Sequence, residues 1–314
     1  MSSTTPPPSY TLLPFTGIQV LHVPADAPTA TPVLIVAFNR PEKYNAVTDS
    51  LLAELEHVYR LIDADDRVRT VVLTGNGKAF CAGADLEIGF SGIIAHKATE
   101  ESRASYRDSG GRVALSILHC SKPTIVALNG PAAGFGLTIT LPCAIRVACS
   151  SAKIALPFSQ RGVTFESIAS FFLPRILGLG RATHIATTGA AYTASDPLVR
   201  GLFSALLPTP QETVEYAVRL AGEIAGNTSV TSTKLMRDML VWGPTTPEET
   251  HRLDSRVFLE VVGGRDNEEG VRSFVEKRRA VFGGRFEREK LGGLYPWWEE
   301  GRKAVEEGKG KAKI

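Results

Sequence analysis

The feature that most constrains the fold is the alternation of short apolar runs with longer amphipathic stretches. The amphipathic pattern is clearest after Thr48, where apolar side chains recur on one face of an expected helix through Ile62. Four apolar runs rich in Val and Ile are bounded by turn residues, as strands are, and they cover residues 18–23, 32–39, 68–75 and 123–130. Strands that alternate with helices predict an α/β core with a parallel or mixed sheet.

Periodicity also divides the chain into segments. Past Leu179 the patterns are mostly helical, so this half is expected to pack as helices on the core or on another subunit. We predict a flexible Ser/Thr/Pro-rich lead, a core, a helical C-terminal region and a lysine-rich, solvated tail, covering residues 1–14, 15–210, 211–290 and 291–314.

Composition excludes several classes of protein. A formal net charge of +2 gives no basic field that would attract nucleic acid. The four cysteines form no C-x-x-C pair and no histidine cluster accompanies them, so we expect no metal site. The longest apolar segment, residues 125–148, contains Pro131, Pro142 and Arg146 and therefore predicts buried core rather than a membrane span.

Two strands end in loops of glycine and alanine, "GKAFCAGADL" and "NGPAAGFG". Neither loop matches a Walker A or a Rossmann fingerprint, so nucleotide binding of those types is not expected. Small residues at such a point allow tight packing of a strand against a helix. They also leave backbone N–H groups bare, and two such groups that converge would make an oxyanion hole. Spacing alone leaves both interpretations open.

Together, "FNRPEKYNAV", "GKAFCAGADL", "KPTIVALNGPAAGFG" and "EEGVRSFVEKRRAVF" resemble the crotonase, or enoyl-CoA hydratase/isomerase, superfamily over roughly residues 15–285. The resemblance implies an α/β spiral of ββα units followed by a C-terminal helical trimerisation region. It also implies that the chain binds an acyl-CoA thioester and stabilises an enolate with two backbone N–H groups. By position these donors are Ala84 and Phe135.

The carboxylates decide which reaction such an oxyanion hole serves. Hydratases of the family carry two glutamates, and their positions fall here on Thr138 and Phe158. Adding water to a double bond requires an acid and a base, which neither side chain can provide. From the sequence, simple hydratase activity is therefore disfavoured.

The stretch of residues 156–178 resembles the delta-3,delta-2-enoyl-CoA isomerases instead, whose glutamate falls on Glu166. Apolar neighbours should raise the pKa of this carboxyl group, which suits a proton shuttle from C2 to C4 of a 3-enoyl thioester. Dienoyl-CoA isomerases use a second carboxylate at the position of Phe158. The sequence therefore predicts a single-glutamate enoyl-CoA isomerase of unsaturated fatty acid β-oxidation.

The resemblance also implies binding residues for the substrate, of which coenzyme A is a part, so no separate cofactor is expected. Lys43 and Lys277 occupy positions that contact CoA in relatives, Lys277 often from a neighbouring subunit of a homotrimer or dimer of trimers. The other predicted contacts are small or loop residues next to the expected CoA path: Ala46, Ala82, Gly83, Asp85, Leu86 and Gly134.

The chain ends in Ala312-Lys313-Ile314, which follows the form of a peroxisomal tripeptide and predicts recognition by the import receptor. The alternative locations are the cytosol and the mitochondrion. Two alternatives to the isomerase remain. One is another crotonase-type enzyme, either a dienoyl-CoA isomerase or a hydratase, including one of a specialised acyl-CoA or secondary-metabolite pathway. The other is a non-catalytic acyl-CoA-binding protein.

Overall fold

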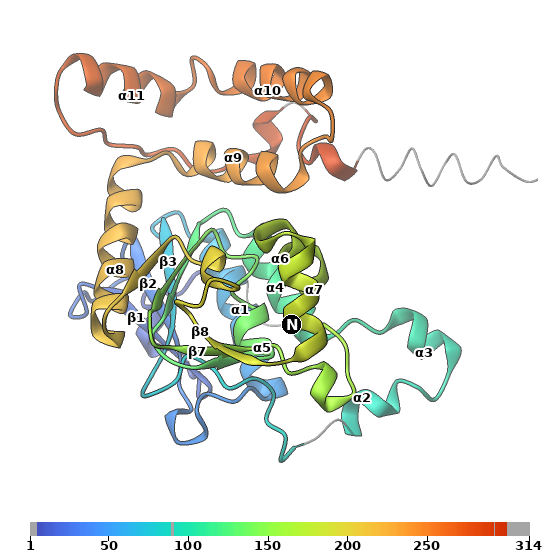
Figure 1. Cartoon of the computed structure of the whole chain (residues 1–314). Helices are drawn as coiled ribbons and strands as arrows, with labels where there is room; N and C mark the ends of the chain where they lie inside the picture. Colours follow the sequence, from blue (N-terminus) through green and yellow to red (C-terminus); the bar gives the residue numbers. More distant parts are fainter. Residues whose placement is uncertain (1–4, 89–90, 292, 300–314) are drawn as a thin grey trace, which may run out of the picture. The chain divides into compact units, whose positions relative to one another are not determined.

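The computed structural model describes residues 5–88, 91–291 and 293–299. The chain divides into two compact units, Met1–Ala225 and Gly226–Ile314, which are described separately. Figure 1 shows the second unit in orange and red, with the strands of the first unit in blue through yellow.

A six-stranded sheet forms the centre of the first unit (Figure 1). The first two strands pair antiparallel, and every later neighbour in the sheet pairs parallel. The strands, in their order across the sheet, are β1 (Ile18–Val23), β2 (Val33–Phe38), β3 (Thr70–Gly75), β4 (Thr124–Leu128), β6 (Ile145–Cys149) and β9 (Ala205–Leu207). The mixed α/β architecture predicted from the alternating pattern is thus confirmed.

The first unit also contains a smaller, three-stranded sheet. Its members are β5 (Ala132–Ala133), β7 (Lys153–Ala155) and β8 (Ala191–Thr193), with β5 parallel and β8 antiparallel to β7. Only three residues separate β4 from β5, so the pairing of β5 with β7 holds the beginning of the second glycine/alanine loop, "NGPAAGFG", in place.

Helices connect the strands of the first unit. The first of them, α1, begins where the sequence predicts, because the Thr48 side chain accepts a hydrogen bond from the Leu51 N–H and caps it. The helices are α1 (Asp49–Ala64), α2 (Ser91–Ala95), α3 (Glu100–Ser105), α4 (Ser109–His119), α5 (Phe135–Thr138), α6 (Ala169–Leu177), α7 (Leu179–Thr188) and α8 (Pro210–Asn227), with short 3-10 turns η1 (Tyr10–Leu12), η2 (Pro41–Lys43), η3 (Ser159–Arg161) and η4 (Arg200–Leu202).

Apolar side chains of the parallel strands pack against α8. Val72, Ile125 and Val147, from three neighbouring strands, form one buried cluster with Ala217 and Ala221 of this helix. The strands are nearly continuous apolar runs because a parallel sheet is covered on both faces.

The second unit contains α9 (Val230–Trp242), α10 (Pro247–Val261), α11 (Arg265–Val275) and the 3-10 turn η5 (Arg288–Leu291). Leu235, Leu253, Val257 and Leu291 form its buried cluster. Residues 293–299, at the start of the tail predicted to be solvated, pack here: the Trp297 indole N–H donates to the Trp242 carbonyl at 3.1 Å. The lysine-rich part of this tail lies outside the described residues.

Two expectations about secondary structure are wrong. The apolar stretch "FGLTITLPCA" after the second glycine/alanine loop predicts a helix, but α5 has only four residues, since the chain continues from Thr138 in turns as far as Ala144. The half beyond Leu179 is not entirely helical, because β8 and β9 lie within it. Both strands have three residues, too few for a period-2 pattern to be read from the sequence.

Candidate active site

Glu166 lies in the loop before α6, and a hydroxyl group contacts each of its carboxyl oxygens. The Thr138 hydroxyl, at the end of α5, donates to Glu166 Oε1 at 2.6 Å. The Ser167 hydroxyl donates to Glu166 Oε2. Thr138 and Ser167 are fully buried, and Glu166 is half-buried. Two segments separated by 28 residues therefore meet at one carboxyl group.

Gly110, in the first turn of α4, provides the space for this group. A Cβ atom added at Gly110 would overlap Glu166 Oε2 and the Ser167 hydroxyl oxygen, and it would lie 3.2 Å from the Phe135 ring. The Glu166 carboxyl group therefore fills the space that a side chain at position 110 would need, and the Phe135 ring borders the same space.

Asp108 caps α4 and holds the backbone next to Glu166. Its Oδ1 accepts hydrogen bonds from the Gly111 N–H at 2.5 Å and from the Ser167 N–H at 3.2 Å. Ser167 and Ile168 both adopt left-handed backbone conformations, with φ of +52° and +53°. Such values are costly for side chains other than glycine, above all for a β-branched one, and they persist only where contacts enforce them.

Burial raises the pKa of Glu166 above its usual value. The hydroxyls of Ser167 and Thr138 oppose this shift because they donate to the charged form, whereas the negative charge of Asp108 adds to it. A raised pKa favours the protonated form of this carboxyl group relative to that of an exposed glutamate. The direction matches the one expected from the apolar sequence around Glu166.

The two glycine/alanine loops lie side by side. Cys81 forms a parallel bridge with Ala132, and the Ala133 N–H donates to the Cys81 carbonyl at 3.0 Å. Gly83 has φ of +95°, and a Cβ atom there would lie 2.7 Å from the Ala133 carbonyl oxygen and 3.7 Å from the Phe135 nitrogen. Glycine is required at this point by both its backbone conformation and the close approach of the second loop.

The amides of Ala84 and Phe135 are both available to a ligand. Among the described residues, neither N–H donates a hydrogen bond to another group of the chain. Phe135 opens α5, where the first N–H groups lack intrahelical partners and the helix dipole is positive. Two amides without an acceptor in the described chain, on adjacent loops, are what an oxyanion hole requires.

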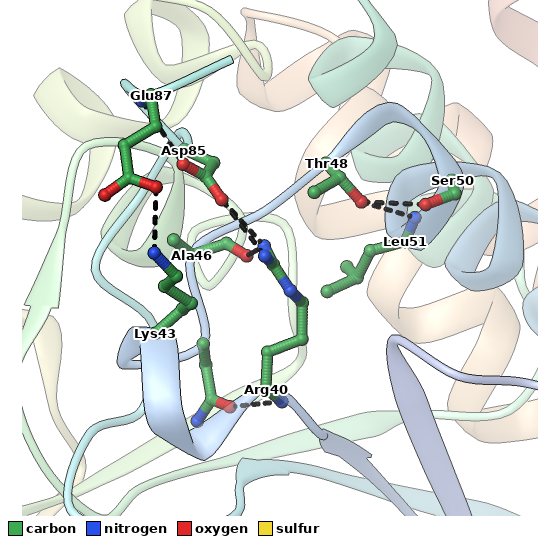
Figure 2. Close-up of polar contacts among 9 residues, drawn as sticks. Arg40, Lys43, Ala46, Thr48, Ser50, Leu51, Asp85 and Glu87 are labelled. Atoms are coloured by element: carbon green, nitrogen blue, oxygen red, sulfur yellow. Dashed lines mark hydrogen bonds and ion pairs between the residues drawn. The ribbon is translucent and has the colours of Figure 1, made fainter.

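Figure 2 shows how the first of these loops is held. The Arg40 guanidinium donates to the Ala46 carbonyl at 2.6 Å and, with both terminal nitrogens, to Asp85 Oδ2 at 3.1 Å. Two backbone hydrogen bonds hold the residues on either side of Ala84: the Val47 N–H donates to the Gly83 carbonyl, and the Asp85 N–H donates to the Val47 carbonyl. Asp85, predicted as a substrate contact, thus has its carboxylate engaged by Arg40.

Lys43, predicted to contact CoA, forms an exposed ion pair with Glu87 at 2.8 Å (Figure 2). The pKa of Lys43 is raised by this hydrogen bond. Ala82 and Leu86 are exposed on the same loop. Lys277 belongs to the second unit, so the contact predicted for it is not tested by the geometry of the first.

Phe158 occupies the position where the sequence resemblance implies a second carboxylate, and its side chain is an aromatic ring. The ring packs edge-on against Phe165, with 5.6 Å between centroids, and a Cβ atom at Gly134 would lie 3.9 Å from it. Gly134 has φ of +50°. This side of the loop is therefore apolar, as the sequence predicts.

Sequence reasoning missed Arg40, Asp108, Gly110 and Ser167. The signal for Asp108 was present, since an aspartate three residues before the Gly111 N–H is a typical helix cap. Gly110 and Gly111 in the first turn of a helix were a second signal, because glycine disfavours helix and needs a reason to be there.

Other predictions concern absent features or the ends of the chain. Within residues 5–88, 91–291 and 293–299, no group of three His, Cys, Asp or Glu side chains could hold a metal ion. No described helix is both long and apolar enough to cross a membrane. Ala312-Lys313-Ile314 lie outside the described residues, so the peroxisomal address stays a prediction.

Glu166 contacts Thr138, at the end of the helix that follows the second of two paired loops, in a mixed α/β fold, and comparisons with known proteins show the family. Residues 29–285 match the family described as "Enoyl-CoA hydratase/isomerase". The chain belongs to this family and is an enzyme of it. The crotonase-like fold predicted from the motifs is thereby confirmed.

Individual relatives carry hydratase names. The chain is 42% identical over 257 residues to enoyl-CoA hydratase AFT3-1 of Alternaria alternata, covering 82% of this chain and 85% of that protein. It is 37% identical to mevalonyl-coenzyme A hydratase SIDH of Beauveria bassiana, over 80% and 91% of the two chains. The solved enoyl-CoA hydratase of Bacillus anthracis superposes with a TM-score of 0.74 at 26% identity, over 86% of this chain and all of that one.

These names favour the hydratase alternative over the isomerase that the sequence predicts. The isomerase expectation rested on the absence of glutamate at Thr138 and Phe158.

Proposed function

We propose that this protein is an enoyl-CoA hydratase that uses one carboxyl group, Glu166, for both proton transfers. The observation that carries the proposal is the 2.6 Å hydrogen bond between the Thr138 hydroxyl and Glu166 Oε1. It places a hydroxyl and a carboxyl group together at the end of the four-residue helix that Phe135 opens, and the Phe135 N–H donates to no other described group. The names of the relatives support the same reaction.

A single carboxylate suffices if it acts first as a base and then as an acid. Ionised Glu166 accepts a proton from water while the water oxygen bonds to C3 of the 2-enoyl thioester. The negative charge moves to the thioester oxygen, where the amides of Ala84 and Phe135 would stabilise it. Glu166 then gives the proton to C2, so that H and OH have both come from one water molecule.

Isomerisation of a 3-enoyl-CoA is the second candidate. It is favoured by the aromatic ring of Phe158 at the position of a second carboxylate. In that reaction Glu166 takes a proton from C2 and returns it to C4, and no water is consumed. The same oxyanion donors serve both reactions, so only the product distinguishes them.

The test offers purified protein 2-enoyl-CoA, 3-enoyl-CoA and 3,5-dienoyl-CoA in water labelled with oxygen-18. The proposal expects the 2-enoyl substrate to give a 3-hydroxyacyl product that carries the label. Conversion of the 3-enoyl substrate to 2-enoyl product, with no labelled hydroxyl from either, would establish the isomerase instead. Binding without turnover of any thioester would contradict both.

Glu166→Gln tests the proposed acid/base directly. The amide is nearly isosteric but cannot accept and return a proton, so turnover should fall about 100- to 10,000-fold with acyl-CoA binding retained. Glu223→Gln, on the exposed face of α8, makes the same chemical change outside the site and should leave turnover unchanged. If the turnover of Glu166→Gln stays within a few-fold of the wild type, Glu166 is not the acid/base of the reaction.

A further inference from the structure

The Thr138 hydroxyl group has two possible acceptors and one proton. Its oxygen lies 2.6 Å from Glu166 Oε1 and 3.2 Å from the carbonyl oxygen of Phe135. A hydroxyl donates only one hydrogen bond but can accept others. Donation to Phe135 therefore frees the Thr138 oxygen to accept a hydrogen bond from Glu166.

From this geometry we infer that Thr138 is a positioning residue that holds Glu166 in both of its protonation states. When Glu166 is ionised, Thr138 donates to the carboxylate. When Glu166 carries the proton, its O–H donates to Thr138, whose own proton turns to the Phe135 carbonyl. This inference rests on the proposed role of Glu166 as the group that gains and loses a proton during each turnover.

Among the described groups around Glu166, Thr138 is the one that contacts carboxyl oxygen Oε1. Ser167 contacts the other carboxyl oxygen, and Asp108 holds the Ser167 amide. Titratable groups also act on the site from neighbouring segments, namely Asp108, Tyr106 and Cys81. Burial raises the pKa of Tyr106, and it raises that of Cys81 to about 12, so neither is charged near neutral pH. None of these residues contacts Oε1 as Thr138 does.

A structural role for Thr138 would be of a different kind. The side chain is fully buried at the end of α5, where its methyl group packs and its hydroxyl bonds to a helix carbonyl. Thr140 has the same features: it is fully buried, and its hydroxyl donates to the Leu137 carbonyl at 2.7 Å. It makes no hydrogen bond with Glu166 and is the matched control.

The experiment compares Thr138→Val, which keeps the shape and loses the hydroxyl, with Thr138→Ser, which keeps the hydroxyl and loses the methyl group. We expect Thr138→Val to lower kcat about 10- to 100-fold with KM changed less than about threefold, because a misplaced base slows chemistry more than binding. Thr138→Ser should restore most of the turnover. Thr140→Val should remain close to the wild type.

The pH profile separates positioning from packing. Thr138→Val removes a hydrogen bond from both forms of Glu166, but the bond to the charged carboxylate is the stronger, so the variant should raise the pKa of Glu166 and move the acidic limb of kcat/KM to higher pH. Thr138→Ser should leave the limb in place. If Thr138→Ser is the more damaged variant, or if the limb of Thr138→Val does not move, Thr138 is a packing residue and the inference is wrong.

A second readout does not depend on the reaction. The pKa of Glu166 is measured by carbon-13 NMR of labelled glutamate carboxyl groups, with the signal assigned by its loss in Glu166→Gln. A higher pKa in Thr138→Val than in the wild type and Thr138→Ser supports the inference even if no enoyl thioester is turned over. In that case the proposed function fails while the positioning of Glu166 stands. Equal pKa values in all three proteins would overturn the inference.

Discussion

Gly110 shapes the candidate site by having no side chain. The space that a Cβ atom would fill is taken by the Glu166 carboxyl oxygen and the Ser167 hydroxyl. Glycine disfavours a helix by about 1 kcal/mol relative to alanine, and here it lies in the first turn of α4. What the glycine provides in return is space for the Glu166 carboxyl group and the Ser167 hydroxyl.

Replacement of Gly110 by alanine should therefore reduce activity more than stability. The added methyl group must displace Glu166 or Ser167, and a displacement of about 1 Å at a reacting group can lower turnover about 100-fold. The assay measures kcat for Gly110→Ala and for Gly180→Ala, a glycine of α7 with open space at its Cβ position. Full activity of Gly110→Ala would show that the carboxyl group need not occupy this position.

At this scale the sequence predicted some residues and not others. Glu166, Ala84 and Phe135 could be found because motifs place them at fixed offsets along the chain. The sequence marks Asp108 and Gly110 only as the start of a helix, because their place in the site comes from contacts with a segment more than 50 residues away. The hydrogen bond between Thr138 and Glu166 also could not be predicted without the fold, although the sequence motifs mark both positions.

Among the elements, the loop after η2 and the loop after β3 behave as one structure. Arg40 ties them together by bonds to Ala46 and Asp85, and Asp85 is nearly buried at 8% side-chain exposure. Lys43 and Glu87 connect the same two loops through an exposed ion pair. Since exposed pairs contribute little, the Arg40 contacts should carry most of the connection.

We expect Arg40→Met to lower the free energy of unfolding by about 1–3 kcal/mol, since it leaves the Ala46 carbonyl and the Asp85 carboxylate without their donor. Lys43→Met should cost less than about 1 kcal/mol. Urea denaturation followed by circular dichroism measures both values. Equal losses for the two variants would mean that Arg40 does not hold the loops together.

The helix α5 shows the limit of prediction for elements. The apolar stretch after the loop predicts a helix of about ten residues, but the chain forms one turn and then leaves it. Pro142 and the turn near Cys143 compete with helix in a segment that is buried throughout. Periodicity does not separate a buried helix from a buried turn, because nearly all positions are buried in both, including those of Thr138 and Thr140.

On the scale of the whole molecule, the second unit exposes apolar side chains along its helices. Phe258, Phe274 and Val275 are each more than two thirds exposed. A groove of about 1280 Å³ is lined by residues of this unit, including Phe258 and Phe274. Exposed apolar surface of this extent is typical of an interaction surface.

Light scattering should therefore detect a homo-oligomer, as the resemblance to the crotonase superfamily implies. Phe274→Glu places a charge on the exposed apolar face and should shift the mass toward the monomer, since burying a charge in an interface is costly. Glu248→Gln, in the exposed first turn of α10, is the control and should leave the mass unchanged. A monomeric wild type would refute the expectation.

The order of strands in the main sheet has a consequence for how such an enzyme can diversify. Both proposed oxyanion donors follow strands that are direct neighbours, β3 and β4, and the loops continue that pairing through Cys81 and Ala132. Paired strands keep a spacing of about 4.8 Å whatever their side chains are. Substitutions in the loops can thus alter the acyl group that is accepted without altering the separation of the two amides. A different reaction would instead require substitutions among the few side chains around Glu166, because these side chains handle the protons in the proposed mechanism.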